Sequence, residues 1–260
     1  MRACLIFWLC LVASTTTVQA QITVRSGTSP DAAGITAVRD QFRVDLGGGT
    51  AASANGSFGG LRREINWDGV PAASSAPNNL SPNFFNVNSP RGVVFSTPGT
   101  GFQVSGATTD PSNPPPRFGN LNVGYSSNFQ TFSAQRLFTP LSSNIFDVRF
   151  FVPGTSVVAD VAGFGLVLTD VDVANTTSLQ FFDAANNSLG TFTAPPLSGG
   201  LTFLGAFVGV NQPRIVRVRA VLGNAATPAN DNNGGSDIVV ADDFIYSEPA
   251  AGPLFANGFE

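Results

Sequence analysis

The sequence predicts a mainly β protein, an antiparallel β-sandwich with one N-terminal helix. Apolar and polar residues alternate along several short segments of the second half, as they do in strands that bury one face. Gly, Pro, Asn and Ser separate these segments, which is typical of sandwich turns. Apolar residues at helical spacing occur near the start. No internal repeat of roughly 20 to 50 residues is visible, so we expect a single domain instead of a solenoid or propeller.

Residues 1–20 have the pattern of a signal peptide. Arg2 supplies the positive charge, residues 5–12 form a short apolar run, and Val18-Gln19-Ala20 offers small residues for cleavage before Gln21. A membrane anchor needs about 20 apolar residues, and this run ends well before that length. We therefore expect an exported protein, secreted or held at the cell surface.

The helix is expected after Ser29, the predicted N-cap, with Pro30 at the first helical position. Three apolar residues follow at intervals of four: Val38, Phe42 and Leu46. Glycines 47–49 then end the pattern. We place this helix in an N-terminal segment, residues 21–48, that packs on the sandwich and covers one end of a sheet.

Residues 49–248 are expected to form the sandwich. The predicted strands of the second half are 146–152, 161–169, 179–183, 188–193, 201–208, 216–220 and 238–246. The interval 184–187 is turn-forming, so its flanking strands should form a hairpin. Between residues 70 and 128 the chain is rich in Pro, Asn, Ser and Gly. This composition predicts long ordered loops or, alternatively, Pro-rich joints between edge strands.

Composition excludes most classes of enzyme. After residue 20 the chain contains no His, Lys or Cys. Serine triads, Cys nucleophiles, Schiff-base lysines, His or Cys zinc sites and disulfides are therefore excluded. Twelve arginines against seventeen carboxylates give a net charge of −5, which repels nucleic acid and anionic lipid. We expect a protein that is not an enzyme, binds no nucleic acid and has no membrane span.

A carboxylate-only glycoside hydrolase is the enzymatic alternative, with Glu64 and Asp68 as its catalytic pair. In a strand, residues four apart lie about 13 Å apart along the backbone. A glycosidase needs roughly 5 to 9.5 Å between its two carboxyl groups. An ion pair of Glu64 with Arg62 or Arg63 explains the same residues without catalysis.

Aspartates form two clusters suited to a hard cation, because Ca²⁺ prefers carboxylate, amide and backbone oxygens. Asp170 and Asp172 lie two residues apart at a strand end and so point the same way. The second cluster contains four aspartates: Asp231, Asp237, Asp242 and Asp243. A helix-loop-helix calcium motif is rejected, because Ser236 replaces its essential Gly and strands flank the segment. We predict a structural Ca²⁺ site of the sandwich type, with a solvated turn at 230–236 as the alternative.

Asp242 and Asp243 are adjacent in a predicted strand, so their side chains are expected on opposite faces. If both faces are covered, one carboxylate must be buried and paired. Its expected partner is an arginine or a cation.

Motifs in both halves carry a family resemblance. Those of the first half are Arg62 to Pro71, Phe84-Phe85-Asn86 and Ser89 to Gly92. Those of the second half are Gly163 to Gly165, Thr169 to Asp172, Ser178 to Asp183, Phe203 to Gly205, Arg214 to Arg219 and Asp242 to Tyr246. Together they cover most of residues 35 to 249, and the chain resembles exported bacterial proteins of the PEP-CTERM type. The resemblance implies a protein of the envelope or the exopolysaccharide.

The last predicted strand is similar to that of jelly-roll carbohydrate-binding modules, which implies a jelly-roll sandwich and a structural calcium. The tail, residues 249–260, departs from the PEP-CTERM pattern, because neither a transmembrane helix nor a basic cluster follows Glu248-Pro249. Residues 254–260 instead look like a short terminal sequence found on exported bacterial proteins. This end is either a secretion tag or a frayed tail.

These observations predict a non-catalytic surface or matrix protein whose partners are polysaccharide or other envelope components. The expected binding site is the sandwich rim, built from the Pro-rich loops with Trp67 as an exposed aromatic. A purely structural envelope protein with no small ligand is the remaining alternative.

Overall fold

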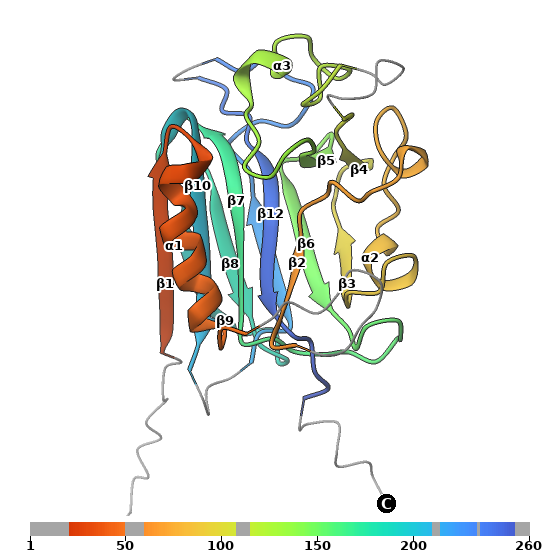
Figure 1. Ribbon diagram of the computed structural model, residues 1–260, viewed down its shortest axis with the longest axis vertical. Helices are drawn as coiled ribbons and strands as arrows, with labels where there is room; N and C mark the ends of the chain where they lie inside the picture. Colours follow the sequence, from red (N-terminus) through yellow and green to blue (C-terminus); the bar gives the residue numbers. More distant parts are fainter. Residues whose placement is uncertain (1–20, 50–59, 108–114, 210–213, 233–234, 253–260) are drawn as a thin grey trace, which may run out of the picture.

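The computed structural model describes residues 21–49, 60–107, 115–209, 214–232 and 235–252. The larger sheet consists of β1 (Ile22–Ser29), β2 (Arg62–Ile65), β4 (Gly101–Val104), β5 (Phe138–Leu141), β7 (Gly163–Val171), β10 (Leu197–Val208) and β12 (Val240–Ser247). The smaller sheet consists of β3 (Val93–Ser96), β6 (Ile145–Phe150), β8 (Ser178–Phe182), β9 (Ser188–Thr193) and β11 (Arg217–Val221). Every strand pairing is antiparallel, which confirms the predicted β-sandwich (Figure 1).

In the larger sheet the strands follow the order β1-β10-β7-β12-β5-β4, with β2 also paired to β12; in the smaller sheet they follow β3-β6-β11-β8-β9. The predicted hairpin is confirmed, because β8 pairs with β9 from Ser178 opposite Thr193 to Phe182 opposite Ser188. The other predicted strands of the second half occur with bounds shifted by a few residues, except at the start of β10, which begins four residues early.

The long helix is α1 (Ala32–Asp45), and its start differs from the prediction. Asp31 is the N-cap, since its side chain accepts a hydrogen bond from the Gly34 amide at 3.0 Å. Ser29 is instead the last residue of β1, a strand that was not predicted because its sequence is mostly polar. The chain thus leaves the sheet two residues later than expected.

The position of α1 is a second correction, because it lies along the outer face of the larger sheet and does not cover a sheet end (Figure 1). Ile35 and Phe42 of the helix are fully buried against Phe203 of β10 and its neighbours. Two opposed glycines, Gly165 and Gly205, permit this approach: a Cβ on either one would lie 3.0 Å from the Phe42 ring. The glycines are therefore required by helix packing.

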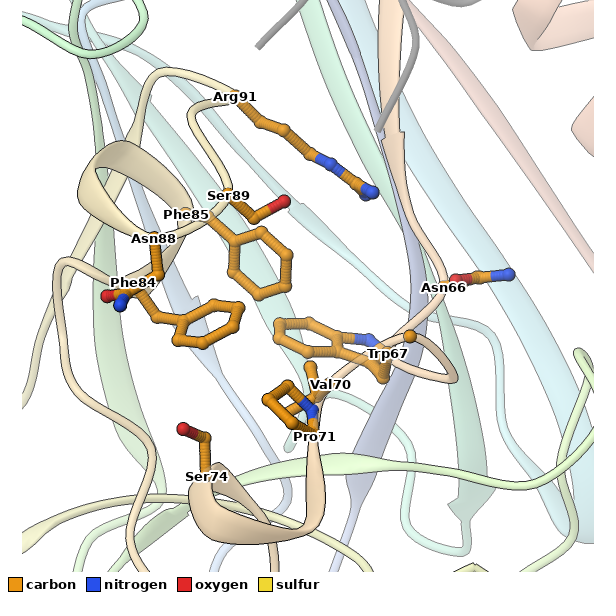
Figure 2. Close-up of a pocket in the computed structure, with 11 residues that line it drawn as sticks. Asn66, Trp67, Val70, Pro71, Ser74, Phe84, Phe85, Asn88, Ser89 and Arg91 are labelled. Carbon is orange, nitrogen blue, oxygen red and sulfur yellow. The ribbon is translucent and has the colours of Figure 1, made fainter. Parts of the chain in front are cut away.

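The Pro-rich region contains edge strands and short helical turns. β3 and β4 are edge strands of the smaller and the larger sheet, respectively. Around them lie η1 (Ala72–Ser74), α2 (Phe84–Val87) and α3 (Tyr125–Asn128). The described part of this region thus combines ordered loops with two short edge strands. Residues of α2 and of the turn after β2 line one pocket (Figure 2).

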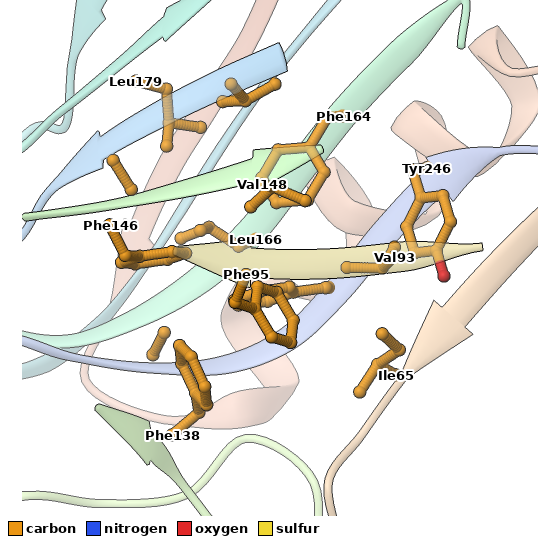
Figure 3. Packing of buried hydrophobic residues seen from close by; sticks show 14 of the residues in the cluster. Ile65, Val93, Phe95, Phe138, Phe146, Val148, Phe164, Leu166, Leu179 and Tyr246 are labelled. Carbon is orange, nitrogen blue, oxygen red and sulfur yellow. The ribbon is translucent and has the colours of Figure 1, made fainter. Parts of the chain in front are cut away.

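Phenylalanine packs with valine, leucine and isoleucine in the core between the sheets (Figure 3). Phe138, Phe146 and Phe244 are fully buried, and their ring centroids lie 5.3 to 6.1 Å apart. Such edge-to-face and offset contacts add to the stabilisation from burial alone. The core therefore fixes the position of the two sheets relative to each other.

No helix among the described residues is long and apolar enough to cross a membrane. The predicted signal peptide (1–20) and residues 253–260 of the predicted tail lie outside the described residues.

Candidate functional site

A cleft of about 430 Å³ opens between the turn after β2 and the segment around α2. We call it the Trp67 cleft; it is lined by Asn66, Trp67, Gly69, Val70, Pro71, Ser74, Phe84, Phe85, Asn88, Ser89 and Arg91. This volume falls within the roughly 300 to 1,000 Å³ of typical small-molecule sites. Among the described residues of the lining, Arg91 alone is charged. The cleft thus combines an apolar floor with a polar rim.

Three aromatic rings form the floor of the cleft. Phe85 meets both neighbours edge to face, with ring centroids 5.5 Å from Trp67 and 5.0 Å from Phe84. Figure 2 shows Arg91 and Ser89 on one side of these rings and Ser74 on the other. The Arg91 guanidinium lies 5.4 Å from the Phe85 ring centroid, within the range of a cation–π contact. One Arg91 Nη donates to the Glu64 carbonyl at 2.5 Å, which fixes the side chain over the floor.

Trp67 is not the exposed aromatic that we expected. Its side chain is 1% exposed, it stacks on Phe138 at 4.4 Å, and its indole N–H donates to the Asp242 carbonyl at 2.9 Å. Trp67 belongs to the same buried cluster as Ile65, two residues earlier in β2, and its backbone is left-handed, φ 66°. The most exposed ring of the floor is Phe84, at 8%. Among the described residues, the exposed large apolar side chains are all aliphatic.

Glu64, one of the two carboxylates of the hydrolase alternative, is held in an ion-pair network beneath α1. Arg43 contacts both Glu64 oxygens, at 2.6 and 2.8 Å, and Arg62 Nε donates at 2.7 Å. Burial alone would raise the pKa of Glu64, but the hydrogen bonds and charges of the two arginines outweigh it, so the pKa lies below its usual range. A carboxyl held as an anion is poorly suited to donate a proton.

Asp68 lies in the turn that follows Trp67. Its Oδ1 accepts a hydrogen bond from the Arg136 backbone amide at 3.1 Å, and burial raises its pKa. Neither Asp68 nor Glu64 lines the Trp67 cleft.

The structure brings three of the six predicted metal-ligating aspartates together at the end of the sandwich near α3. Asp170, Asp172 and Asp231 each present an oxygen within 4.8 Å of the others. Burial and the neighbouring carboxylates of Asp231 and Asp172 raise the pKa of Asp170 to about 8. Ionisation of all three carboxyl groups together is therefore unfavourable.

Asp237 has a different role beside this cluster. It accepts hydrogen bonds from the amides of Asp172 and Val173, at 3.1 and 3.3 Å, and from the Thr176 hydroxyl. It is fully buried and ties the turn after β7 to the segment that precedes β12. These backbone contacts indicate a structural function for its carboxylate.

Asp242 and Asp243 lie on the same face, which corrects the expectation of opposite faces. A β-bulge in β12 places both residues opposite Val167 of β7, between Ala241 and Phe244. Val167 packs under α1 on the outer face, whereas Ala241 and Phe244 point into the core. The bulge adds one residue to the strand, so both carboxylates are directed outward beneath the helix.

The Asp242 carboxylate is fully buried and accepts hydrogen bonds from the Phe132 amide at 2.6 Å and the Ser133 hydroxyl at 3.1 Å. Burial and the adjacent carboxylate of Asp243 raise its pKa well above the usual range. Asp243 Oδ2 lies 4.0 Å from an Arg39 nitrogen, so the predicted arginine partner is present at long range. Neither aspartate belongs to the cluster around Asp170.

Comparison with known protein families, curated proteins and solved structures finds no match for this chain. Function is therefore inferred from the residues themselves. Sequence reasoning missed Ser74, Phe84, Phe85 and Arg91 as parts of one site. The only local signal was the adjacent aromatic pair, Phe84 and Phe85, within a Pro-rich stretch. Trp67 comes from a distant part of the chain, so its place beside this pair follows from tertiary packing.

Proposed function

We propose that the chain is an exported, non-catalytic surface or matrix protein that binds polysaccharide in the Trp67 cleft. The observation that supports this most strongly is the lining of that cleft, an aromatic floor rimmed by amide, hydroxyl and guanidinium groups. Sugars present apolar C–H faces together with many hydroxyls. A floor of ring edges and a rim of hydrogen-bonding side chains complement both features.

The shape of the cleft favours a short stretch of a polymer over a buried small molecule. Asn88 and Asn66 at the rim are exposed, and Ser74, Ser89 and Arg91 are half-buried. A chain of sugars can therefore enter sideways and leave most of its length in solvent. The cleft volume accommodates a mono- or disaccharide unit of such a chain.

The environment of the carboxylates favours binding over hydrolysis. Glu64 is neutralised by Arg43 and Arg62 and lies outside the cleft lining, as does Asp68. The hydrolase alternative needs a carboxyl pair facing bound sugar. A purely structural role without a ligand makes no use of an open, polar-rimmed cleft.

Export is proposed from the signal-peptide pattern of residues 1–20. Expression of the full chain in a bacterial host should release protein whose N-terminal residue is Gln21, measured by mass spectrometry of the medium and periplasm. Uncleaved protein retained in the cytoplasm would contradict export.

Binding is tested with residues 21–260 against a panel of neutral and uronate-containing bacterial and plant polysaccharides, by affinity electrophoresis and calorimetry. The decisive variant is Asn88→Trp, which places a large side chain over the cleft. Its matched control is Val87→Trp, because Val87 is the preceding residue, is 62% exposed and does not line the cleft. We expect saturable binding that falls at least tenfold in Asn88→Trp and is retained in Val87→Trp.

Absence of binding across the panel would favour the structural alternative, and shortening of any polymer would favour the hydrolase. Equal binding by both tryptophan variants would place the site elsewhere.

A further inference from the structure

Three carboxylates from distant parts of the chain meet beside α3. Asp170 and Asp172 come from the end of β7 and the residues after it, and Asp231 comes from the segment between β11 and β12. Figure 1 shows α3 and this segment together over the end of the larger sheet. Their nearest oxygens lie within 4.8 Å of one another. Like charges at this separation repel unless a cation or a proton lies between them.

Asp172 is the observation that points to a ligand. Both of its carboxylate oxygens are shielded from solvent, and neither accepts a hydrogen bond from any described residue. Buried carboxylates are normally paired with a cation or satisfied by donors, because removing them from water is costly. No ion pair between an arginine and any of these three aspartates occurs in the described part of the chain.

The other two carboxylates are oriented by donors that leave coordination capacity. Asp170 Oδ1 accepts from the Gly199 amide at 2.6 Å. Asp231 accepts from the Ile238 amide and from the Asn128 side chain, each at 3.2 Å. A carboxylate oxygen that accepts one hydrogen bond retains a second lone pair for a metal ion. These hydrogen bonds hold the ligands in place, as the outer contacts of metal sites commonly do.

We propose that Asp170, Asp172 and Asp231 bind one Ca²⁺ ion, which joins the end of β7 to the segment before β12. The ligand set is all oxygen, which suits a hard cation and disfavours zinc or copper. Oxygens on opposite sides of Ca²⁺, each 2.3 to 2.6 Å from the ion, lie up to about 5 Å apart. The three oxygens, all within 4.8 Å of one another, are therefore close enough to share one such ion.

The ion would stabilise a separate small core at this end of the sandwich. Phe118, Tyr125 and Phe129 from the α3 segment pack there against Ile238 and Val240. Asn128 of α3 donates to Asp231, so the metal ligand also holds the helix that contributes those rings. Ca²⁺ would thereby hold β7, α3 and the segment before β12 together.

This proposal is independent of the Trp67 cleft, because no residue of the cluster lines the cleft. Failure of calcium binding and failure of polysaccharide binding are therefore distinguishable. The protein used is residues 21–260, stripped with chelator and titrated with CaCl₂ and, separately, MgCl₂ by calorimetry. Melting curves are recorded with and without each ion.

We expect one Ca²⁺ per chain with a Kd of about 10⁻⁵ to 10⁻³ M, and weaker binding of Mg²⁺. At one hundred times the Kd, the melting temperature should rise by about 5 to 10 °C. Wild-type protein that gives no calcium heat and no shift of its melting temperature at 10 mM CaCl₂ would overturn the proposal.

The decisive variant is Asp172→Asn. It removes a charge whose two oxygens are shielded from solvent and unpaired among the described residues. Without calcium its melting temperature should therefore equal or exceed that of the wild type, while the rise caused by calcium should disappear. Asp183→Asn is the matched control, because Asp183 lies in the β8–β9 turn outside the cluster, and it should retain the full calcium response. An Asp172→Asn protein that still gains stability from Ca²⁺ would show that the ion binds elsewhere or adventitiously.

Discussion

Replacing Asp242 with Ala tests the outward-facing bulge of β12. The change leaves the Phe132 amide without its acceptor beneath α1, whereas the Ser133 hydroxyl keeps the Asn66 carbonyl, 3.2 Å away, as an acceptor. An unsatisfied buried donor costs about 1 to 3 kcal/mol, and relief of repulsion with Asp243 recovers part of that cost. We expect a net loss of about 1 to 2 kcal/mol in the free energy of unfolding. At 2 to 4 °C per kcal/mol, this lowers the melting temperature by about 2 to 8 °C.

The matched variant is Asp243→Ala, measured by the same calorimetric melting and urea titration. Asp243 Oδ1 accepts no hydrogen bond from the described residues, and its Oδ2 lies 4.0 Å from Arg39. Because Asp243 is buried with one unpaired oxygen, its removal also relieves a desolvation cost and should change the free energy of unfolding by less than about 1 kcal/mol. Two results would contradict the bulge geometry of β12. One is a melting temperature of Asp242→Ala equal to that of the wild type, and the other is a larger loss of stability in Asp243→Ala than in Asp242→Ala.

Two further substitutions test the helix–sheet contact. Glu64→Gln removes a carboxylate whose folded pKa is depressed, so it should cost about 1 to 3 kcal/mol at pH 7. The ionised Glu64 side chain stabilises the wild type above its pKa in the unfolded chain, about 4.3, and this stabilisation disappears as the pH falls through its lower pKa in the folded protein. The difference in free energy of unfolding between wild type and variant, measured by urea titration, should therefore be smaller at pH 3 than at pH 7. Gly205→Ala pushes a methyl group against the Phe42 ring and should cost about 1 to 3 kcal/mol, whereas Gly69→Ala, with open space around it, should cost less than about 1 kcal/mol. Equal melting temperatures for the two alanine variants would contradict the close approach of α1.

The sandwich and its hairpin were predictable because strand patterning is local. Alternation along β6 and β11, and the turn before β9, carry their own signal. The sequence of β1 gives little sign of a strand, since only Ile22 and Val24 mark its buried face. The strand depends instead on its pairing with β10. The N-cap was misplaced for the same reason, because β1 extends to Ser29.

The sites were predictable only in part, because they depend on which distant residues meet. Asp170 and Asp172 were identifiable from their spacing, but their closeness to Asp231 follows from sheet topology. The bulge at Asp242 depends on the register between β12 and β7, which strand period alone does not reveal. Trp67 is buried by stacking on Phe138, which comes from a distant strand, and that contact is not visible in the local sequence.

Hydrogen exchange of residues 21–260, with and without a saturating oligosaccharide from the bound polymer, tests the proposed site most directly. The Trp67 cleft predicts slower exchange confined to residues 66–74 and 84–91, which contribute its lining. Asn88→Trp should abolish that change, and Val87→Trp should preserve it. Protection that maps to any other face of the sandwich, or an unchanged exchange pattern under saturating ligand, would contradict polysaccharide binding in this cleft.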